Sequence, residues 1–572
     1  MKASDYIAKF LEKKGIKYIF ELSGGMITHI LDSLNQLTKI QIISMHHEQS
    51  AAFAAEGFAR MTGIPGIALA TSGPGATNLL TGIGSCYFDS VPCIFITGQV
   101  NRHELKLERN IRQLGFQETD IVSMAKPITK ACFQIIDPNE LQNILELAFV
   151  ISTSGRPGPV LIDIPMDVQR SNIEITPFNN ETKELIEFKT TLIYDLINDI
   201  NNSKKPLILC GRGIRASNSI VLFKNFATIT KIPIVSSLLG LDVISYEDSQ
   251  RVGFIGSYGN RWANLALGNC DLLIVLGSRL DIRQTGADTN YFQNRKIYHI
   301  DCEKDEINNR IIGCVPIISD LKYFFEKFNK IACDHEFEIK SDWIKFIEEE
   351  KLKWPDTKEV DTIGINPNVF MHLLSSNSKK VAAYLADVGS HQMWAAQSLE
   401  IGINQHFLTS GGMGAMGFAL PASIGACLAV NKSPVIVLIG DGCMQLNIQE
   451  LQTISRNKLP IKIIVFNNES LGMIRQFQDS YFESRYQSTS WGYSAPDFEK
   501  VAIAYGIQAK TINNEKEVLT AINWLWESNN ESRPQLLQVM INPHTNTYPK
   551  LAFGRPITEM EPFVKPLDME GT

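Results

Sequence analysis

The sequence predicts an α/β protein made of three doubly wound domains, each with a parallel sheet that helices cover on both faces. Apolar runs of strand length alternate with helical patterns almost throughout the 572 residues, as in βαβ folds. The runs are continuous in Val, Ile and Leu, which is typical of strands buried on both faces. One hydrophobic core cannot serve so long a chain, so several domains are expected. The expected strands include 17–22, 66–70, 92–97, 160–164, 206–210, 271–276, 297–300, 435–439 and 461–466.

Two polar stretches divide the chain into blocks of ordinary domain size. The first covers about 169–189, and the second, which is charged and weakly apolar, covers about 334–366. We interpret both as linkers. The predicted units are therefore residues 1–175, 190–340 and 362–545, followed by a surface segment over 546–572 that is rich in proline and charge.

The composition narrows the class of protein. A hydrophobic fraction of 44%, a charged fraction of 20% and a formal charge of −7 describe an ordinary soluble protein and give no electrostatic case for nucleic acid or an anionic membrane as partner. No apolar run reaches the roughly twenty residues of a transmembrane helix. The N-terminus is typical of an amphipathic helix with Ser4 as candidate cap, not of a signal peptide. Ten scattered cysteines without metal-ligand spacing suit a reducing compartment, so a cytoplasmic location is expected.

Polar groups follow two consecutive strands of the third block. The strand over 435–439 runs into Asp441 within a Gly-Asp-Gly sequence, and a helix over 445–457 and a strand over 461–466 then lead to Asn468. Ligands bind at the carboxyl ends of parallel strands, so Asp441 and Asn468 are expected to lie together. Mg²⁺ takes such oxygen ligands and shares them with phosphates. Gly-Asp-Gly alone is more often a simple turn, but the strand context on both sides favours a metal–diphosphate site.

This pattern resembles the diphosphate motif of the thiamine-diphosphate enzymes, in which Gly-Asp-Gly precedes Asn-Asn at a similar spacing. The resemblance implies Asp441, Asn468 and the main-chain oxygen of Ser470 as Mg²⁺ ligands. It also implies a carboxyl group bonded to the aminopyrimidine of the cofactor, because that bond promotes the tautomer that removes the thiazolium C2 proton. Such a group needs an apolar, water-poor setting.

Glu48 fits that requirement. It follows an expected strand over 40–44 and opens a helix with alanines at positions 51, 52, 55 and 59, a small face that allows close helix–helix approach. An acidic residue that merely suits the helix dipole is the common alternative. Glu56 and Arg60 are expected to form a plain ion pair, and the adjacent His46 and His47 are given no role.

The likeness to acetolactate synthases and large-subunit acetohydroxyacid synthases covers nearly the whole chain, through the segments at 70–78, 89–100, 116–119, 153–165, 411–418 and 467–477. It implies that Gln117 borders the reacting substrate and that Met416 wedges between the two cofactor rings, although a flexible gap-filler is the ordinary reading of a core Met. It also implies a homodimer or homotetramer with shared sites, and makes no prediction about a regulatory subunit. The other implied cofactor-binding residues are Gly25, Pro74, Asn78, Val388, Gly389, His391, Gly414, Gly442, Gly472 and Met473.

The middle block resembles the flavin-binding domain of acetohydroxyacid synthases, and FAD is expected. A Gly-Arg-Gly sequence after the strand over 206–210 is weak evidence by itself, since a structural turn is about as frequent. Catabolic acetolactate synthases of the same family lack the flavin. The implied FAD residues are Arg156, Gly211, Gly213, Gly277, Arg279, Asp301 and Asp320.

Three departures from the family pattern touch the acceptor side of the site. Met166 stands where the family usually has Lys, Ile282 where it usually has Asp, and Phe477 where it usually has Trp. Arg283 is retained and suits an acceptor carboxylate. A basic, insertion-like run over 101–115 precedes Phe116, the other residue expected near the substrate.

The sequence therefore predicts a decarboxylating carboligase that converts pyruvate, a 2-keto acid, to an enamine and adds it to a second carbonyl. A keto-sugar nucleotide from polysaccharide biosynthesis is an alternative acceptor. A pyruvate oxidase is another alternative, as is a simple decarboxylase, although Val100 and Asn101 stand where decarboxylases typically carry a His-His pair. The last alternative is a catalytically silent protein with the same fold. The presence of Glu48, Asp441 and Asn468 argues against it, because a silent protein need not keep them.

Overall fold

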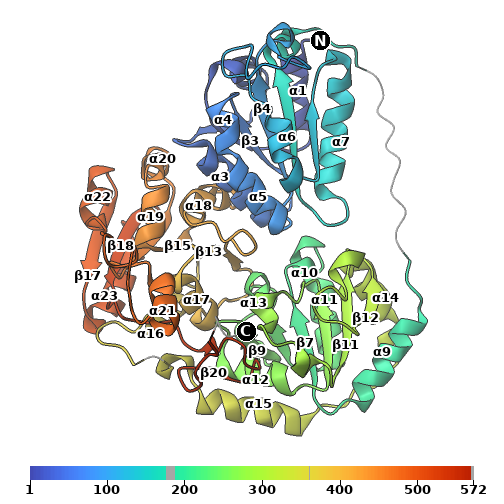
Figure 1. Ribbon diagram of the computed structural model, residues 1–572, viewed down its shortest axis with the longest axis vertical. Coiled ribbons are helices and arrows are strands. Elements are labelled where there is room, and N and C mark those ends of the chain that lie inside the picture. The colour runs from blue at the N-terminus through green and yellow to red at the C-terminus, as the bar shows by residue number, and fades with distance from the viewer. Residues whose placement is uncertain (176–186, 360, 569–572) are drawn as a thin grey trace.

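The computed structural model describes residues 1–175, 187–359 and 361–568, which contain three six-stranded parallel sheets (Figure 1). The first sheet has the order β2-β1-β3-β4-β6-β5. Its strands are β1 (Tyr18–Leu22), β2 (Gln41–Ser44), β3 (Gly66–Ala70), β4 (Cys93–Gln99), β5 (Ala131–Gln134) and β6 (Pro159–Pro165). Its helices are α1 (Ala3–Lys13), α2 (Thr28–Leu37), α3 (Glu48–Thr62), α4 (Pro74–Asn78), α5 (Leu80–Phe88), α6 (Ile121–Ala125), α7 (Leu141–Thr153) and α8 (Met166–Arg170).

The central sheet has the order β12-β11-β10-β7-β8-β9. Its strands are β7 (Pro206–Cys210), β8 (Ile234–Ser236), β9 (Arg251–Phe254), β10 (Leu272–Leu276), β11 (Lys296–Asp301) and β12 (Val315–Ile318). Its helices are α9 (Thr191–Asn202), α10 (Gly213–Ala216), α11 (Ile220–Thr230), α12 (Arg261–Asn269), α13 (Ile282–Thr285), α14 (Leu321–Ala332) and α15 (Ser341–Lys353).

The third sheet has the order β14-β13-β15-β16-β18-β17. Its strands are β13 (Ala383–Ala386), β14 (His406–Leu408), β15 (Val435–Gly440), β16 (Ile461–Asn467), β17 (Gln508–Ile512) and β18 (Gln535–Met540). Its helices are α16 (Pro367–Ser376), α17 (Ser390–Ser398), α18 (Ala419–Ala429), α19 (Asp441–Leu446), α20 (Glu450–Arg456), α21 (Gly472–Tyr481), α22 (Phe498–Ala504) and α23 (Glu515–Leu525). A two-stranded antiparallel ribbon, β19 (Lys550–Leu551) and β20 (Met560–Glu561), follows.

Each sheet is covered on both faces, which confirms the doubly wound architecture. Successive residues of a strand point to opposite faces. In β3, Ile67 and Leu69 enter a core shared with α1, whereas Ala68 and Ala70 enter one shared with α3. In the central sheet, Leu207 and Ile208 likewise belong to different cores.

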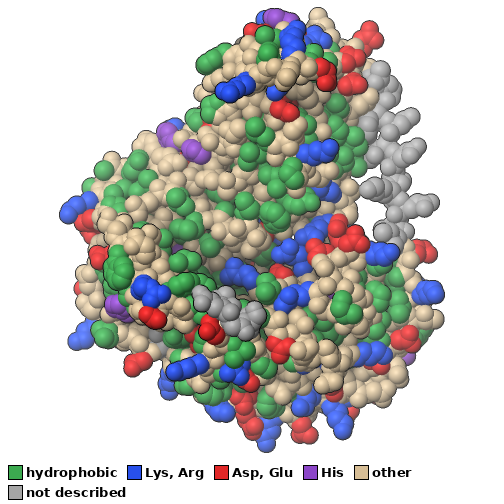
Figure 2. All heavy atoms as spheres, viewed as in Figure 1, with side chains coloured by type: hydrophobic (Ala, Val, Ile, Leu, Met, Phe, Trp, Pro, Cys, Tyr) green, Lys and Arg blue, Asp and Glu red, His purple; other side chains and the backbone are tan. Residues whose placement is uncertain are grey.

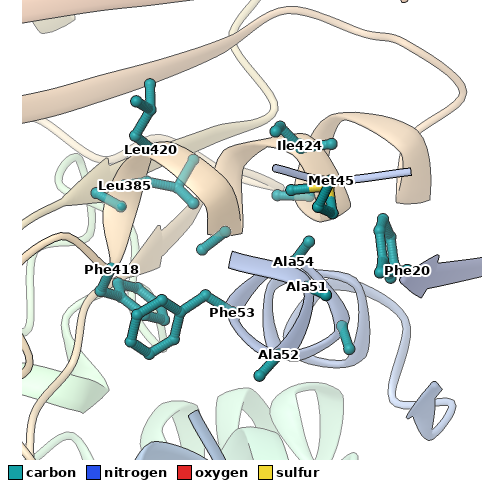
Figure 3. Packing of buried hydrophobic residues seen from close by; sticks show 14 of the residues in the cluster. Phe20, Met45, Ala51, Ala52, Phe53, Ala54, Leu385, Phe418, Leu420 and Ile424 are labelled. Atoms are coloured by element: carbon teal, nitrogen blue, oxygen red, sulfur yellow. The ribbon is translucent and has the colours of Figure 1, made fainter. Parts of the chain in front are cut away.

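The first and third domains share a single core, which α3 and α18 form between their sheets (Figure 3). Phe53 of α3 meets Phe418 edge-on, with ring centroids 5.4 Å apart. A β-carbon at Gly57 would lie 2.1 Å from the carbonyl oxygen of Ala422. One at Gly425 would lie 1.8 Å from that of Ala54, so main chain packs against main chain. The predicted close helix–helix approach is found where Ala52 meets Gly82 of α5, whereas the contacts with α18 are made at Ala54 and Gly57, outside the predicted face.

Several local predictions were wrong. Ser4 does not cap α1 but is buried within it, where its hydroxyl accepts a hydrogen bond from Ser33 at 2.8 Å. The helix predicted over 445–457 is broken into α19 and α20, because the Asn447 side chain bonds other segments instead of continuing a helical face.

The second predicted linker, 334–366, contains α15, whose Trp343 is buried and donates from Nε1 to the Pro206 carbonyl at 3.0 Å. The first predicted linker begins too early in the chain, since Gln169 is buried in α8. Residues 176–186 of this linker lie outside the described part of the chain.

The segment after residue 545 is not a mere surface segment. Leu551, Ile557 and Met560 are buried in the core on one face of the central sheet (red ribbon beside α12 in Figure 1). Arg261 of α12 donates to the Glu561 carbonyl at 3.0 Å and so fastens the ribbon to the central domain. Within the described residues, none of the helices has both the length and the apolar character to cross a membrane.

Candidate functional site

Glu48 begins α3 at the edge of the first sheet, directly after β2 and the turn at His46 and His47. The His47 ring nitrogen Nδ1 caps the helix by accepting from the Gln49 main chain at 3.1 Å. Only 7% of Glu48 is exposed. Asn78 donates from Nδ2 to Glu48 Oε2 at 2.9 Å, so the structure brings these two predicted residues together.

The loop after β3 closes over Glu48. A β-carbon at Gly75 would lie 3.2 Å from Glu48 Oε1. The neighbouring Pro74 is exposed, and so is Gly25, which starts a short turn. The main chain of Met26 in that turn donates to the Thr71 hydroxyl in the loop after β3, at 3.3 Å. Of the three predicted pyrimidine-side residues, Asn78 bonds the Glu48 carboxylate, Pro74 lies in the loop that covers it, and Gly25 precedes the residue that bonds this loop.

Gln117 lies against the same loop. Its φ of +67° is unusual for a residue with a side chain, and a β-carbon at Gly73 would lie 3.0 Å from its Cβ. The adjacent Phe116 is 80% exposed. Glu118 holds this segment by accepting from the main chains of Lys106 at 2.5 Å and Leu114 at 2.7 Å.

Asp441 begins α19 at the end of β15, beside β16, which leads to Asn468 and Ser470. The carboxyl group is 2% exposed and accepts from the Gly442 main chain at 3.0 Å through Oδ1, while Oδ2 has no partner. Burial raises the pKa of Asp441 to about 7, and the Ser470 main chain and the Tyr493 hydroxyl face its carboxylate. A buried carboxylate oxygen without a partner is rare in folded proteins and calls for an explanation.

The wall beside Asp441 is formed by two strand ends. The His391 ring fits between Gly389 and Gly440, where β-carbons would lie 2.6 Å and 2.9 Å from it. Burial lowers the pKa of His391 to about 3, so the ring is neutral, and its Nε2 has no partner. Ser390 Oγ is also buried without a partner and would lie 3.0 Å from a β-carbon at Gly472.

The remaining residues predicted to bind the cofactor follow from the third domain. Met416 Cε would be 3.5 Å from a β-carbon at Gly442. Gly414 has a φ of +63°, and the Val388 carbonyl accepts from Cys443 Sγ at 3.0 Å. Met473 is half-buried against the core of the third sheet.

The Glu48 and Asp441 clusters remain separate within one chain. Among the described residues no hydrogen bond joins them directly. The closest link is Asn447, whose Oδ1 accepts from Ser50 at 3.0 Å and whose Nδ2 donates to the Gly417 carbonyl at 2.8 Å. In the described part of the chain, no group of three His, Cys, Asp or Glu side chains could hold a metal, so His46 and His47 form no such site.

A cavity lies where the three domains meet and holds about 1200 Å³ of empty space, counting the solvent at its mouth. Its wall includes every predicted flavin residue except Gly211. That glycine packs against the central sheet instead, since its β-carbon would lie 2.2 Å from the Gly277 carbonyl. Lys and Arg side chains gather around the hollow seen in Figure 2. The predicted residues in the wall are Arg156, Gly213, Gly277, Arg279, Arg283, Asp301 and Asp320.

Several of these side chains are already engaged within the chain. Arg156 pairs with Glu306 at 2.5 Å, and Arg279 pairs with Asp281 at 3.2 Å. Asp320 caps α14 by accepting from the Lys322 main chain at 2.8 Å. Phe477 is not in the cavity wall; it packs against Tyr481, with ring centroids 4.8 Å apart.

Comparison with known proteins gives the family. The sequence matches the models of the thiamine pyrophosphate enzyme N-terminal TPP binding domain over residues 1–124, the central domain over 193–328 and the C-terminal TPP binding domain over 387–539. It is 36% identical to the acetolactate synthase large subunit of Lactococcus lactis over 97% of this chain and 95% of that protein. The chain belongs to the acetolactate synthase family of thiamine pyrophosphate enzymes. It is therefore a thiamine-diphosphate-dependent enzyme of the acetolactate synthase type.

Distant members of this family show the same extent of similarity. A probable acetolactate synthase large subunit of Methanocaldococcus jannaschii is 36% identical over all of this chain and 96% of that protein. The chloroplastic acetolactate synthase 2 of Nicotiana tabacum is 34% identical over 97% of this chain and 84% of that protein.

Sequence reasoning missed three polar residues of this acetolactate synthase-type site. Asp387 directly follows β13 and is fully buried, so the strand-end signal that pointed to Asp441 could have found it. Asp89 is buried after α5 and lines the central cavity, and Tyr493 faces Asp441 from a distant loop. Asp89 stands at the start of the 89–100 segment that carries the family likeness, but no role was assigned to it, and Tyr493 has no sequence signal because only the fold brings it to the site.

Proposed function

We propose that the protein is a thiamine-diphosphate- and Mg²⁺-dependent carboligase that decarboxylates pyruvate and joins the remaining two-carbon unit to a second carbonyl compound. When bound, thiamine diphosphate supplies the electron sink for both steps. The observation that carries the proposal is the buried carboxylate of Glu48 with one oxygen engaged by Asn78. The other oxygen, Oε1, is left to share a proton with the pyrimidine ring nitrogen.

The Asp441 cluster suits a divalent cation. The orphaned Oδ2 of Asp441 together with the Asn468 amide oxygen and the Ser470 main-chain oxygen would supply hard oxygen ligands at one strand edge. The neutral His391 ring and the unpartnered Ser390 hydroxyl lie beside this set and can donate to phosphate oxygens. Met416, next to Gly442, would hold the cofactor rings in a bent shape.

The central cavity supports FAD as a further bound group. Its four arginines, Arg156, Arg212, Arg279 and Arg283, suit a diphosphate, and its two glycine loops approach each other too closely for side chains. The separation of the Glu48 and Asp441 clusters supports a homodimer or homotetramer in which each site is completed by a second copy. We place the enzyme in the cytoplasm, since nine of the ten cysteines are at least half-buried and all are free thiols.

The substitution Glu48→Gln tests the proposal. We expect it to abolish CO₂ release from pyruvate in the presence of thiamine diphosphate and Mg²⁺, because an amide cannot share a proton with the ring. Glu21→Gln is the matched control: Glu21 is a buried residue of the same domain whose side chain accepts from Ser44, and its variant should keep normal turnover. Near-normal CO₂ release by Glu48→Gln would refute the assignment of Glu48.

The acceptor is decided by product analysis. Mass spectrometry of reactions with labelled pyruvate alone should show 2-acetolactate if a second pyruvate accepts the two-carbon unit. Oxygen uptake without a ligated product would instead indicate a pyruvate oxidase, and free acetaldehyde a decarboxylase. A wild-type protein that binds thiamine diphosphate and releases no CO₂ would be a silent homologue.

A keto-sugar nucleotide is a second candidate acceptor, because the acceptor side of the site is open. Phe116 is exposed beside Gln117, and Arg283 lines the cavity with no ion-pair partner among the described residues. An apolar ring face and a free guanidinium group suit a large anionic acceptor. A labelled product formed only when such a nucleotide is added would establish this activity, and Arg283→Ala should then raise the KM of the nucleotide without changing CO₂ release.

A further inference from the structure

The segment between β14 and α18, residues 409–418, carries Met416 and contains no helix or strand. We call it the Met416 loop. Two of its glycines, Gly414 and Gly417, have φ of +63° and +81°. A segment with flexible glycines and no helix or strand keeps one conformation only if other residues hydrogen-bond its main-chain groups.

The N-terminal end of the Met416 loop is held by Asp89, which belongs to the first domain. Asp89 Oδ2 accepts from the Gly411 main chain at 2.9 Å, and Oδ1 accepts from Gly412 at 2.6 Å. Arg60 neutralises this carboxylate at 2.5 Å and also donates to the Thr409 carbonyl at 3.0 Å. Asp89 and Arg60 are both buried, so these bonds are shielded from water.

The second end is held by Asp387, from the end of β13. Its Oδ1 accepts from Gly417 at 2.9 Å and from Val388 at 2.8 Å, and its Oδ2 accepts from Ala419 at 2.7 Å. No cation pairs with this buried carboxylate within the described residues. Main-chain donors and the Cys443 thiol bond this carboxylate in place of a cation, and hydrogen bonds to a charged acceptor are strong.

Between its ends the loop is tied to both halves of the site. Ala415 donates to Ser410 Oγ at 3.0 Å, which fixes the turn before Met416. Asn447 accepts from Ser50, two residues after Glu48, and donates to the Gly417 carbonyl. The position of Met416 relative to Glu48 and Asp441 therefore depends on how the loop is anchored.

We propose that Asp89 and Asp387 are positioning residues that hold the Met416 loop from its two ends and thereby set Met416 for the cofactor. The inference rests on the proposed function, since Met416 is the residue expected to bend the cofactor. Asp89 accepts from Gly411 and Gly412 of the loop, and Asp387 accepts from Gly417 of the loop and from Ala419, which directly follows it, so each acts through the loop. Removing either anchor frees one end of the loop and leaves the ligands of the diphosphate intact.

The anchors can be tested without cofactor, by hydrogen–deuterium exchange of main-chain amides followed by mass spectrometry. Asp89→Asn should speed exchange at Gly411 and Gly412, and Asp387→Asn at Ala419, because an amide NH₂ replaces an accepting oxygen. Asp271→Asn is the matched control: Asp271 accepts from the main chains of Lys204 at 2.9 Å and Lys205 at 3.0 Å in a loop of the central domain. It should leave the Met416 loop unchanged.

The second readout separates positioning from binding. In D₂O, the rate at which bound thiamine diphosphate exchanges its C2 proton should fall about tenfold or more in Asp89→Asn and Asp387→Asn, since a small misplacement of reacting groups costs this much. In Asp89→Asn, the Kd of thiamine diphosphate with Mg²⁺ should change less than about threefold, because Asp89 bonds none of the residues predicted to bind the diphosphate. The control variant should match the wild-type protein in both.

Unchanged amide exchange in the loop, or unchanged C2 proton exchange in both variants, would overturn the proposal. A wild-type protein without C2 proton exchange would defeat the proposed function instead, and the amide exchange would still decide whether the two aspartates anchor the loop. If Asp89→Asn does not fold, because the buried Arg60 keeps only Glu56 of its two carboxylate partners, Ser410→Ala takes its place. That variant removes the bond to Ala415 and should slow C2 proton exchange about threefold; a wild-type rate would count against the proposal.

Discussion

The packing of α3 on α18 permits a direct test by adding a single carbon atom. In Gly57→Ala the new β-carbon would lie 2.1 Å from the Ala422 carbonyl oxygen. The shortest ordinary carbon–oxygen contacts are about 3.3 Å. Because the obstructing atom belongs to the main chain, it cannot rotate away, and the two helices must separate by roughly 1 Å.

Two opposing effects set the magnitude. Replacing Gly by Ala within a helix favours folding by about 1 kcal/mol. Overpacking a filled core costs about 1–3 kcal/mol, and here the upper value applies because main chain opposes main chain on a shared core. We therefore expect a net loss of about 2 kcal/mol in the free energy of unfolding. Glu48 starts the displaced helix, so CO₂ release should fall about 100-fold as well.

Urea unfolding measures the first effect and CO₂ release from pyruvate the second. The matched control is Gly84→Ala in α5, where the new β-carbon would meet side chains alone, the flexible Met413 at 3.4 Å and Ile128 at 3.9 Å. This variant should be as stable as the wild-type protein or slightly more so. Equal stability and activity of the Gly57→Ala and Gly84→Ala proteins would show that the two helices are not held together by glycine contacts.

Three further predictions concern other parts of the structure. Burial alone would lower the pKa of His372, but Asp356 and Glu400 raise it above its usual value, so its ion pairs stabilise the fold below about pH 6.5 and are lost as pH rises through the raised pKa. His372→Gln should therefore lower the Tm at pH 6 and have much less effect on it at pH 9. An equal loss of Tm at both pH values would contradict this prediction. Arg261→Lys should cost roughly 2 kcal/mol in urea unfolding, because lysine cannot form the two-pronged bond to Glu359 at 2.7 Å and 2.9 Å; an unchanged midpoint would contradict it. Tyr493→Phe should weaken Mg²⁺ binding about tenfold in the presence of thiamine diphosphate, measured by titration, since the phenol faces Asp441; unaltered affinity would assign Tyr493 a packing role only.

The sequence was sufficient wherever a local pattern has one structural meaning. The strands over 66–70 and 206–210 end where predicted, because their apolar runs are bounded by glycine and proline. The small face of α3 was recognised from alanine spacing alone. Strand ends placed Asp441 and Asn468 at one edge, since parallel neighbours must present their carboxyl ends together.

The failures share a physical cause. Helix α15 was predicted to be part of a linker because its sequence is largely charged. Only Trp343 and Ile347 of this helix are buried against the central domain. The break after α19 depends on Asn447, whose partners Ser50 and Gly417 are distant in sequence. Side chains of this kind act through the folded chain, and one sequence contains no sign of their partners.

The place of Leu551, Ile557 and Met560 in the central core has a consequence for how the polypeptide is made. A ribosome finishes the central domain long before it adds these residues, because all of the third domain is translated in between. Until then the central domain has an unfilled apolar patch where the ribbon will sit. Its final packing must therefore wait until late in synthesis, and a nascent chain stalled earlier would be a natural client for chaperones that bind exposed apolar surface.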